Sequence, residues 1–348
     1  MTTTDIRQLI FVIGFPRSGT TWFSNLINSH PDTVYRHEVF GRQHASFGNE
    51  LFRRLKFDHG LSDSDYTTVI RTVLNANLET DRPPFFPKRF RTIRSEFIQQ
   101  LAWVSARAIP ILSPLYAWLY TPRGEEVTLV VKETRSSVDL ESIIAGARAD
   151  KVIVLVRHPY GVIASHLRGI QAGLMGMSSA ESRSSWFKYH ADASYVRGAA
   201  IAEEELLRMS ESEFLAVTWR VQNENYLGIH SHHDKSQVII YDSFLKDRMK
   251  NTVQLLRFLE LDPDDQIFNF LKRSAESGKR RGILGDASSD YFSVYRAKGA
   301  RTLWRDVLAA EDLRAIDRRT GELVERIGFG KSMSPEDISA VTPLRTIS

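Results

Sequence analysis

A glycine-spaced loop near the N-terminus constrains the fold more than any other feature of the sequence. Residues 14–21 have the sequence GFPRSGTT, and they stand between a short apolar run and a stretch of apolar residues at helical spacing. This is the spacing of a phosphate-binding loop, in which consecutive backbone N–H groups lead into a helix N-terminus and hold an anion. We therefore predict a strand, a loop and a helix, with an anion held by the loop residues Arg17, Ser18, Gly19, Thr20 and Thr21.

The loop departs from that of the nucleoside triphosphatases at one position. Thr20 stands where their motif has the lysine that reaches the terminal phosphates. This difference disfavours hydrolysis of ATP or GTP. A P-loop kinase stays as an alternative function, and a tight turn with incidental hydroxyls stays as an alternative structure.

Four short apolar runs predict an α/β fold. They do not alternate between polar and apolar residues, which is typical of strands in a parallel sheet that helices cover on both faces. Residues 1–330 would form a single domain with a helical insertion at about 39–126, followed by a loosely held tail at 331–348. We predict a central, mostly parallel sheet flanked by helices, with strands at Leu9–Ile13, Val127–Val131, Val152–Val156 and Val238–Tyr241.

Composition and charge narrow the class of protein. Lys plus Arg number 46 and Asp plus Glu number 42, a net charge of +4, so we expect local sites for small anions and no nucleic-acid surface. The absence of cysteine excludes disulfides and fits a cytoplasmic protein. The longest apolar stretch, residues 97–120, is interrupted by glutamine, arginine and proline. It is therefore a poor transmembrane span, although it could lie on a membrane surface.

A second motif follows the third apolar run. Residues 151–168, KVIVLVRHPYGVIASHLR, place Arg157 at the carboxyl end of a strand and Ser165 on the helix that follows. A guanidinium and a hydroxyl in these positions can converge on one phosphate at the edge of the sheet. A surface role for Arg157 is the alternative.

Together the two motifs resemble those of a known enzyme family. PRSGTTW at residues 16–22 resembles the 5′-phosphosulfate loop of sulfotransferases that use 3′-phosphoadenosine 5′-phosphosulfate (PAPS), and the second motif resembles their 3′-phosphate motif. The resemblance implies a P-loop-like fold and transfer of a sulfuryl group from PAPS, with adenosine 3′,5′-bisphosphate as the product. It implies no metal.

Weaker similarities extend over the rest of the chain. VIIYDSFLKD at residues 238–247 is similar to the family's tyrosine-bearing strand, which implies that Tyr241 faces the adenosine or is part of the core. Ser274-Ala275-Glu276 replaces a Thr-Ser-Phe stretch that contacts adenosine in cytosolic members, so Trp22 becomes the main candidate for stacking on adenine. A basic glycine motif that closes over the 3′-phosphate is matched, with an inserted alanine, by Arg296, Lys298 and Gly299.

The catalytic residues are also inferred from the resemblance. Family members have a lysine at the position of Lys132, where it stabilises charge on the leaving phosphate. Cytosolic members have a histidine base two residues later, but here that residue is Thr134. The carbohydrate and tyrosyl-protein types use a glutamate instead, which corresponds to Glu38, and His37 is the alternative base. We expect burial in a cleft to raise the pKa of Glu38 and so to suit it to accept a proton.

The acceptor is the least determined part of the prediction. The aromatic residues from Trp103 to Tyr120 lie in the predicted insertion, where acceptor choice would be encoded, so a small-molecule, carbohydrate or lipid-like hydroxyl or amine is expected. Three histidines at 230, 232 and 233 lack carboxylates at ligand spacing, and we predict no zinc. A non-catalytic nucleotide-binding protein stays as a further alternative.

Overall fold

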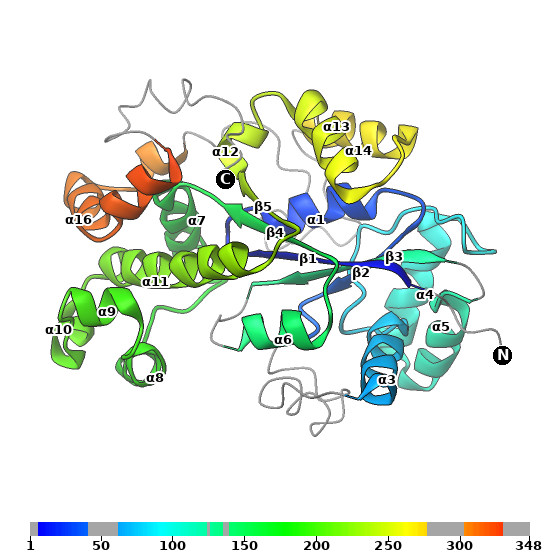
Figure 1. The fold of residues 1–348 in the computed structure, drawn as a ribbon, viewed down its shortest axis with the longest axis horizontal. Helices are drawn as coiled ribbons and strands as arrows, with labels where there is room; N and C mark the ends of the chain where they lie inside the picture. The colour runs from blue at the N-terminus through cyan, green and yellow to red at the C-terminus, as the bar shows by residue number, and fades with distance from the viewer. Residues whose placement is uncertain (1–5, 41–61, 124–125, 135–138, 277–302, 330–348) are drawn as a thin grey trace.

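A five-stranded parallel sheet forms the centre of the molecule (Figure 1). The computed structural model describes residues 6–40, 62–123, 126–134, 139–276 and 303–329. The strand order is β2-β3-β1-β4-β5, and every paired neighbour is parallel. The α/β prediction is therefore confirmed. The strands are β1 (Ile6–Gly14), β2 (Thr33–His37), β3 (Val127–Glu133), β4 (Lys151–Val156) and β5 (Ser236–Ile240).

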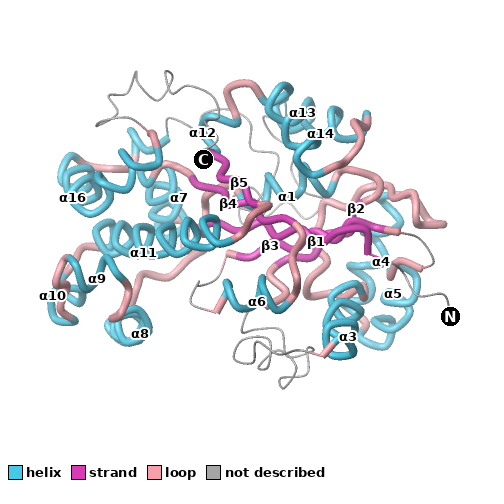
Figure 2. The backbone as a smooth tube through the Cα atoms, viewed as in Figure 1, coloured by secondary structure: helices cyan, strands magenta, loops and turns pink. Residues whose placement is uncertain are grey.

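Helices cover both faces of this sheet (Figure 2). Those after the first strand are α1 (Thr20–Asn28), α3 (Asp63–Leu74), α4 (Glu96–Ala108), the 3₁₀ helix η1 (Pro110–Leu112), α5 (Ser113–Tyr120) and α6 (Leu140–Gly146). Those after β4 are α7 (Pro159–Gln171), α8 (Ala180–His190), α9 (Ser194–Gly198), α10 (Glu203–Arg208) and α11 (Glu211–His232). The last are α12 (Tyr241–Phe244), α13 (Arg248–Leu259), α14 (Asp265–Glu276), η2 (Leu303–Asp306) and α16 (Ala310–Ile327).

Two hydrophobic clusters explain why the strands read as continuous apolar runs. Successive residues of a strand point to opposite faces, so Phe11 and Ile13 of β1 lie in one cluster and Ile10 and Val12 lie in the other. The first cluster includes Trp219 of α11, and the second includes side chains of α1, α13 and α14. Because both faces are covered, the residues of β1 from Leu9 to Ile13 are apolar on both sides.

The structure differs from the sequence prediction at two strands. The edge strand β2 was not predicted, because its fourth residue, Arg36, breaks the apolar pattern. That side chain is nevertheless only 1% exposed, since Nη1 donates to Asp81 Oδ1 at 2.7 Å and Nε donates to the carbonyl of Val73 at 2.9 Å. The last predicted strand ends one residue early, so Tyr241 begins α12 instead of ending β5.

The predicted insertion is described only in part. Its described residues hold α3, α4, η1 and α5, whereas residues 41–61 lie outside the described part of the chain. The predicted tail at 331–348 also lies outside it. None of the helices in the described ranges is long and apolar enough to cross a membrane.

Candidate functional site

The loop between β1 and α1 has the backbone of an anion cradle. Arg17 and Gly19 both have positive φ, 72° and 90°, and the N–H of Ser18 donates to the carbonyl of Phe15 at 3.0 Å. Gly19 precedes the first residue of α1, and no side chain caps this helix end. The Ser18 hydroxyl is fully buried without a hydrogen-bond partner. A buried polar atom without a partner at an uncapped helix N-terminus fits a site that a ligand completes.

Gly19 is required at its position for two reasons. Its φ of 90° is in a region that side-chain-bearing residues rarely adopt. A Cβ atom there would also lie 2.4 Å from Cε2 of Tyr241. The Tyr241 ring therefore rests directly on the loop backbone.

Aromatic side chains continue from this ring into the core. The ring centroids of Tyr241 and Trp22 are 6.1 Å apart in an edge-on arrangement. Trp22 also packs against Phe244 and Phe270, and it is 8% exposed. Its predicted stacking on adenine stays a prediction, as does the contact of Tyr241 with adenosine.

The second motif meets the first at the loop. Strand β4 ends at Val156, and α7 begins at Pro159, so Arg157 leaves the sheet edge and Ser165 lies on the helix. Arg17 Nε donates to Ser165 Oγ at 3.2 Å, and Arg157 Nη1 donates to the carbonyl of Arg17 at 3.1 Å. Two arginines and a serine that are far apart in sequence thus converge beside the anion cradle.

Several contacts hold Arg157 in this place. The indole of Trp219 on α11 donates to the Arg157 carbonyl at 3.2 Å. Asp242 Oδ1 lies 4.0 Å from Nε of Arg157. The guanidinium carbon lies 5.5 Å from the centre of the Tyr241 ring. The next residue, His158, accepts a hydrogen bond from the N–H of Tyr160 and so caps α7. Burial lowers the pKa of His158 to about 4, so this imidazole is neutral and can accept that bond.

Glu38, the predicted base, and Lys132, the residue predicted to stabilise the leaving phosphate, form an ion pair. Glu38 follows β2 directly, and Lys132 lies near the end of the neighbouring strand β3, in register with His37. Lys132 Nζ lies 2.6 Å from Glu38 Oε1, and the Thr134 hydroxyl donates to the same oxygen at 2.6 Å. The backbone N–H of Glu38 donates to the Lys132 carbonyl at 2.8 Å. The pairing of β3 with β1 also confirms that Lys132 lies on a strand adjacent to the one that carries the loop.

The expected direction of the Glu38 pKa was wrong. Burial alone would raise it, as the sequence led us to expect. The ammonium of Lys132, the imidazole of His37 and the hydrogen bonds from Lys132 and Thr134 outweigh burial and lower the pKa to about 2. The carboxylate is therefore ionised at neutral pH.

His37 has a different set of neighbours. Its Nδ1 lies 2.8 Å from the hydroxyl of Tyr35, and its Nε2 lies 3.9 Å from Glu38 Oε1. Burial, reinforced by the negative charges of Glu38 and Glu133, raises the pKa of Tyr35 well above its usual value. Its phenol is therefore neutral and available as a hydrogen-bond donor to His37.

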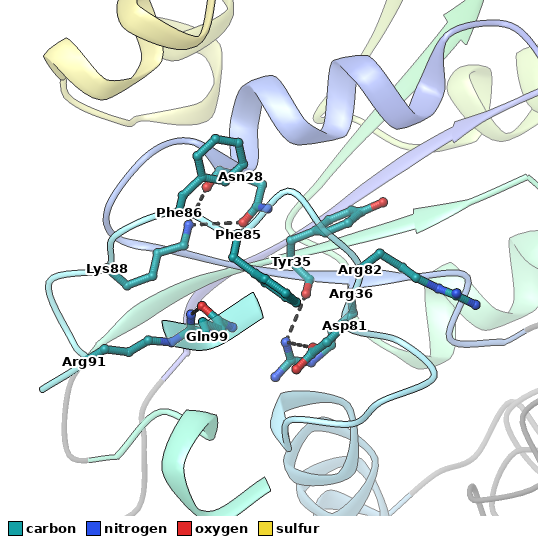
Figure 3. Close-up of a pocket in the computed structure, with 10 residues that line it drawn as sticks. All are labelled: Asn28, Tyr35, Arg36, Asp81, Arg82, Phe85, Phe86, Lys88, Arg91 and Gln99. Atoms are coloured by element: carbon teal, nitrogen blue, oxygen red, sulfur yellow. Dashed lines mark hydrogen bonds and ion pairs between the residues drawn. The ribbon is translucent and has the colours of Figure 1, made fainter. Parts of the chain in front are cut away.

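A small polar cavity lies at the opposite end of α1 (Figure 3). Its volume is about 20 Å³, enough for about one water molecule and too small for a nucleotide. Buried Lys88 points toward the end of α1, where its Nζ donates to the carbonyls of Asn28 and His30. Burial holds the pKa of Lys88 well below its usual value, and its hydrogen bonds supply partners for carbonyls at the C-terminal end of α1.

Three predicted site residues cannot be compared with the structure. Arg296, Lys298 and Gly299 lie outside the described residues. Within the described part of the chain, no group of three or more histidines, cysteines or carboxylates could hold a metal. The bond from Thr134 to Glu38 was missed by sequence reasoning, although the alternation of a strand places positions 132 and 134 on one side and could have indicated it.

The chain matches one protein-family model and several solved structures. A family model described as "Sulfotransferase family" matches residues 9–265. No curated protein sequence matches the chain. The chain is similar to the sulfotransferase domain of the Synechococcus PCC 7002 olefin synthase, with 18% identity, coverage of 91% of this chain and 95% of that one, and a TM-score of 0.43. It is also similar to mouse sulfotransferase SULT7A1 complexed with PAP, with 13% identity, coverage of 97% of this chain and 91% of that one, and a TM-score of 0.46. For sulfotransferase STF9 from Mycobacterium avium the identity is 17%, the coverage is 93% of this chain and 77% of that one, and the TM-score is 0.41.

Proposed function

The chain belongs to the sulfotransferase family, and we propose that it transfers a sulfuryl group from PAPS to a hydroxyl or amine by in-line displacement. The convergence of Arg17, Ser165 and Arg157 beside the anion cradle carries this proposal. A guanidinium presents a planar fork of donors that matches phosphate oxygens, so these residues suit a ligand with more than one phosphate.

The two motifs take the two ends of this donor. The loop over residues 17–21 holds the 5′-phosphosulfate through backbone N–H groups, hydroxyls and Arg17. Arg157 and Ser165 hold the 3′-phosphate, and Tyr241 and Trp22 border the adenosine. The hydrogen bond between Arg17 and Ser165 connects the groups that hold the two ends.

The reaction needs stabilised charge on one side and a base on the other. As the sulfur–oxygen bond to the 5′-phosphate breaks, negative charge grows on that phosphate, and Lys132 and Arg17 stabilise it. As the bond from the acceptor to sulfur forms, Glu38 accepts the acceptor's proton. A positioned base of this kind commonly contributes about 10²- to 10⁴-fold in rate.

The ion pair couples these two roles. With Lys132 at 2.6 Å, Glu38 has a pKa of about 2 and is a weak base. A donor phosphate that draws the ammonium toward itself removes the largest influence that lowers this pKa, and burial then makes the carboxylate more basic. Base strength therefore increases when the donor is in place. We propose that the acceptor is a small molecule, a carbohydrate or a lipid-like molecule. We also propose a cytoplasmic location.

A thermal-shift experiment with adenosine 3′,5′-bisphosphate and with Mg-ATP tests donor binding. A ligand at about 100 times its dissociation constant adds about 2.7 kcal/mol to the stability of the folded protein. We expect the bisphosphate to stabilise the protein, and we expect Arg157→Ala to abolish that effect. Arg314→Ala, which removes an exposed arginine on α16, is the matched control and should retain it.

Turnover is then measured with labelled PAPS and a pool of hydroxylated and amine acceptors. Transfer of label that Glu38→Gln reduces by about 10²-fold or more supports the assigned base. Stabilisation by Mg-ATP alone would refute the donor assignment, and bisphosphate binding without turnover on any acceptor would refute the enzymatic function.

A further inference from the structure

An unusually apolar outer surface covers α4, η1 and α5. Among the described residues, thirteen large hydrophobic side chains are exposed, and nine of them lie between residues 97 and 119. Ile111 is 83% exposed, Phe97 is 65% exposed and Trp118 is 58% exposed. We define the helical hairpin surface by these nine side chains: Phe97, Ile98, Leu101, Val104, Ile109, Ile111, Leu115, Trp118 and Leu119.

These side chains share one side of each helix. On α4, residues 97, 101 and 104 recur at helical spacing, and on α5 residues 115, 118 and 119 do the same. The opposite sides are buried, with Gln99 and Ala106 on α4 and Tyr116 and Tyr120 on α5. The exposed apolar stripe is therefore an ordered second face of a packed hairpin and does not result from fraying.

The charge around this surface is positive. Between residues 94 and 123, the exposed charged side chains are three arginines and one glutamate: Arg94, Arg107, Arg123 and Glu96. Arg89 is also exposed, but it is paired with Asp32 and Asp264. The guanidinium of Arg107 lies 4.7 Å from the ring centre of Trp103, and that of Arg123 lies 4.8 Å from the ring centre of Trp118. Cations therefore lie at the border of the apolar residues, where lipid headgroups would lie if the apolar side chains entered a bilayer.

We propose that the helical hairpin surface binds the surface of a membrane that carries anionic phospholipids. An apolar face bordered by arginine and tryptophan lies in the plane of the headgroups, and its affinity combines apolar burial with attraction to anionic lipid. The hairpin lies at one end of the long axis of the molecule, and α8, α9 and α10 lie at the other, so it can reach a flat surface without obstruction by those helices (Figure 1). None of the helices in the described ranges is suited to span the bilayer, so the contact is peripheral.

Charge distinguishes this occupant from a second copy of the chain. A two-fold interface places the same patch on both sides, so the arginines around one hairpin would face those around the other. An anionic bilayer complements the same arginines. The proposal does not depend on sulfuryl transfer, and its test uses no turnover.

Cosedimentation with vesicles tests the proposal. The full-length protein is mixed with vesicles of phosphatidylcholine and phosphatidylglycerol, or with vesicles of phosphatidylcholine alone. We expect binding to the anionic vesicles that weakens as salt is added. The triple variant Phe97→Glu, Ile111→Glu, Trp118→Glu should bind about 10²-fold more weakly or worse, because it removes apolar burial and adds repulsion.

Two further variants separate apolar burial from charge. Met177→Glu with Leu207→Glu and Met249→Glu places the same number of charges at exposed apolar positions elsewhere and should bind like the wild type. Arg94→Gln with Arg107→Gln should weaken binding about 25-fold, since each arginine near an anionic surface contributes about fivefold. All of the substituted residues are exposed, so we expect each variant to fold. Urea unfolding, or a thermal shift with adenosine 3′,5′-bisphosphate, verifies this.

Three results would overturn the proposal. One is a wild-type protein that does not bind the anionic vesicles, or binds phosphatidylcholine alone equally well. Another is a triple variant that binds as the wild type does. The third is a wild-type dimer in analytical ultracentrifugation that the triple variant converts to a monomer, because the surface would then be an interface between copies.

Discussion

Replacing Glu38 by glutamine should remove a pH-dependent part of the protein's stability. The folded protein holds the Glu38 pKa at about 2, below the value of 4.5 for the unfolded chain, because Lys132 and Thr134 contact the carboxylate. A carboxyl whose pKa is lower in the folded state stabilises it fully above pH 4.5, and this contribution is lost as the pH falls toward 2. The free energy that corresponds to this difference in pKa is about 3 kcal/mol.

The part that is accessible to experiment lies between pH 6 and pH 3.5. Near pH 6 almost the whole contribution is present, and near pH 3.5 about 1.4 kcal/mol of it is lost, because the unfolded chain then binds a proton that the folded protein does not. Other carboxylates titrate in the same range, so the useful quantity is the difference between the wild type and Glu38→Gln at each pH.

Urea unfolding at both pH values measures this difference. Glu38→Gln should be less stable than the wild type near pH 6, and the gap should shrink by about 1.4 kcal/mol near pH 3.5. Glu325→Gln, at an exposed position on α16, controls for the loss of one negative charge. A gap that stays constant or widens as the pH falls would refute the argument that Lys132 and Thr134 stabilise the ionised form of Glu38.

Two further substitutions test the backbone that supports the site. Gly19→Ala should destabilise the protein by about 1–3 kcal/mol or more in urea unfolding, because φ is 90° and the new Cβ would overlap the Tyr241 ring; an unchanged stability would contradict this. Trp219→Phe should cost about 2 kcal/mol or more, since it leaves a cavity and removes the hydrogen bond to the Arg157 carbonyl. The same variant should weaken adenosine 3′,5′-bisphosphate binding in a thermal shift, and equal binding would show that Arg157 does not depend on this contact.

The core of the fold could be predicted because its information is local. Strands that helices cover on both faces are apolar on both sides along most of their length, so β1, β3, β4 and β5 each contain a short continuous apolar run. The two phosphate motifs were equally local, since each lies on one strand, one loop and one helix. Their convergence required only that β1 and β4 be neighbours, which the register between Ile10–Gly14 and Lys151–Leu155 confirms.

The contacts of Arg36 were not predictable in the same way. Its burial depends on Asp81 and on carbonyls at the end of α3, which the chain reaches only through tertiary packing. An arginine within a short segment argues against a buried strand until these acceptors are known. The sequence contains the acceptors, but no spacing rule connects them with position 36.

The error about Glu38 has the same origin as the missed strand. Burial of a carboxyl can be guessed from its position after a helix and before an apolar segment, and burial alone raises a pKa. Whether burial decides the outcome depends on which charge lies opposite, and that is set by β2, whose pairing with β3 places His37 in register with Lys132. Without β2 there is no reason to place position 38 within 2.6 Å of an ammonium that is 94 residues away in the sequence. The direction in which the pKa of the proposed base is shifted thus depends on strand order, and it cannot be predicted from the motif that identifies the base.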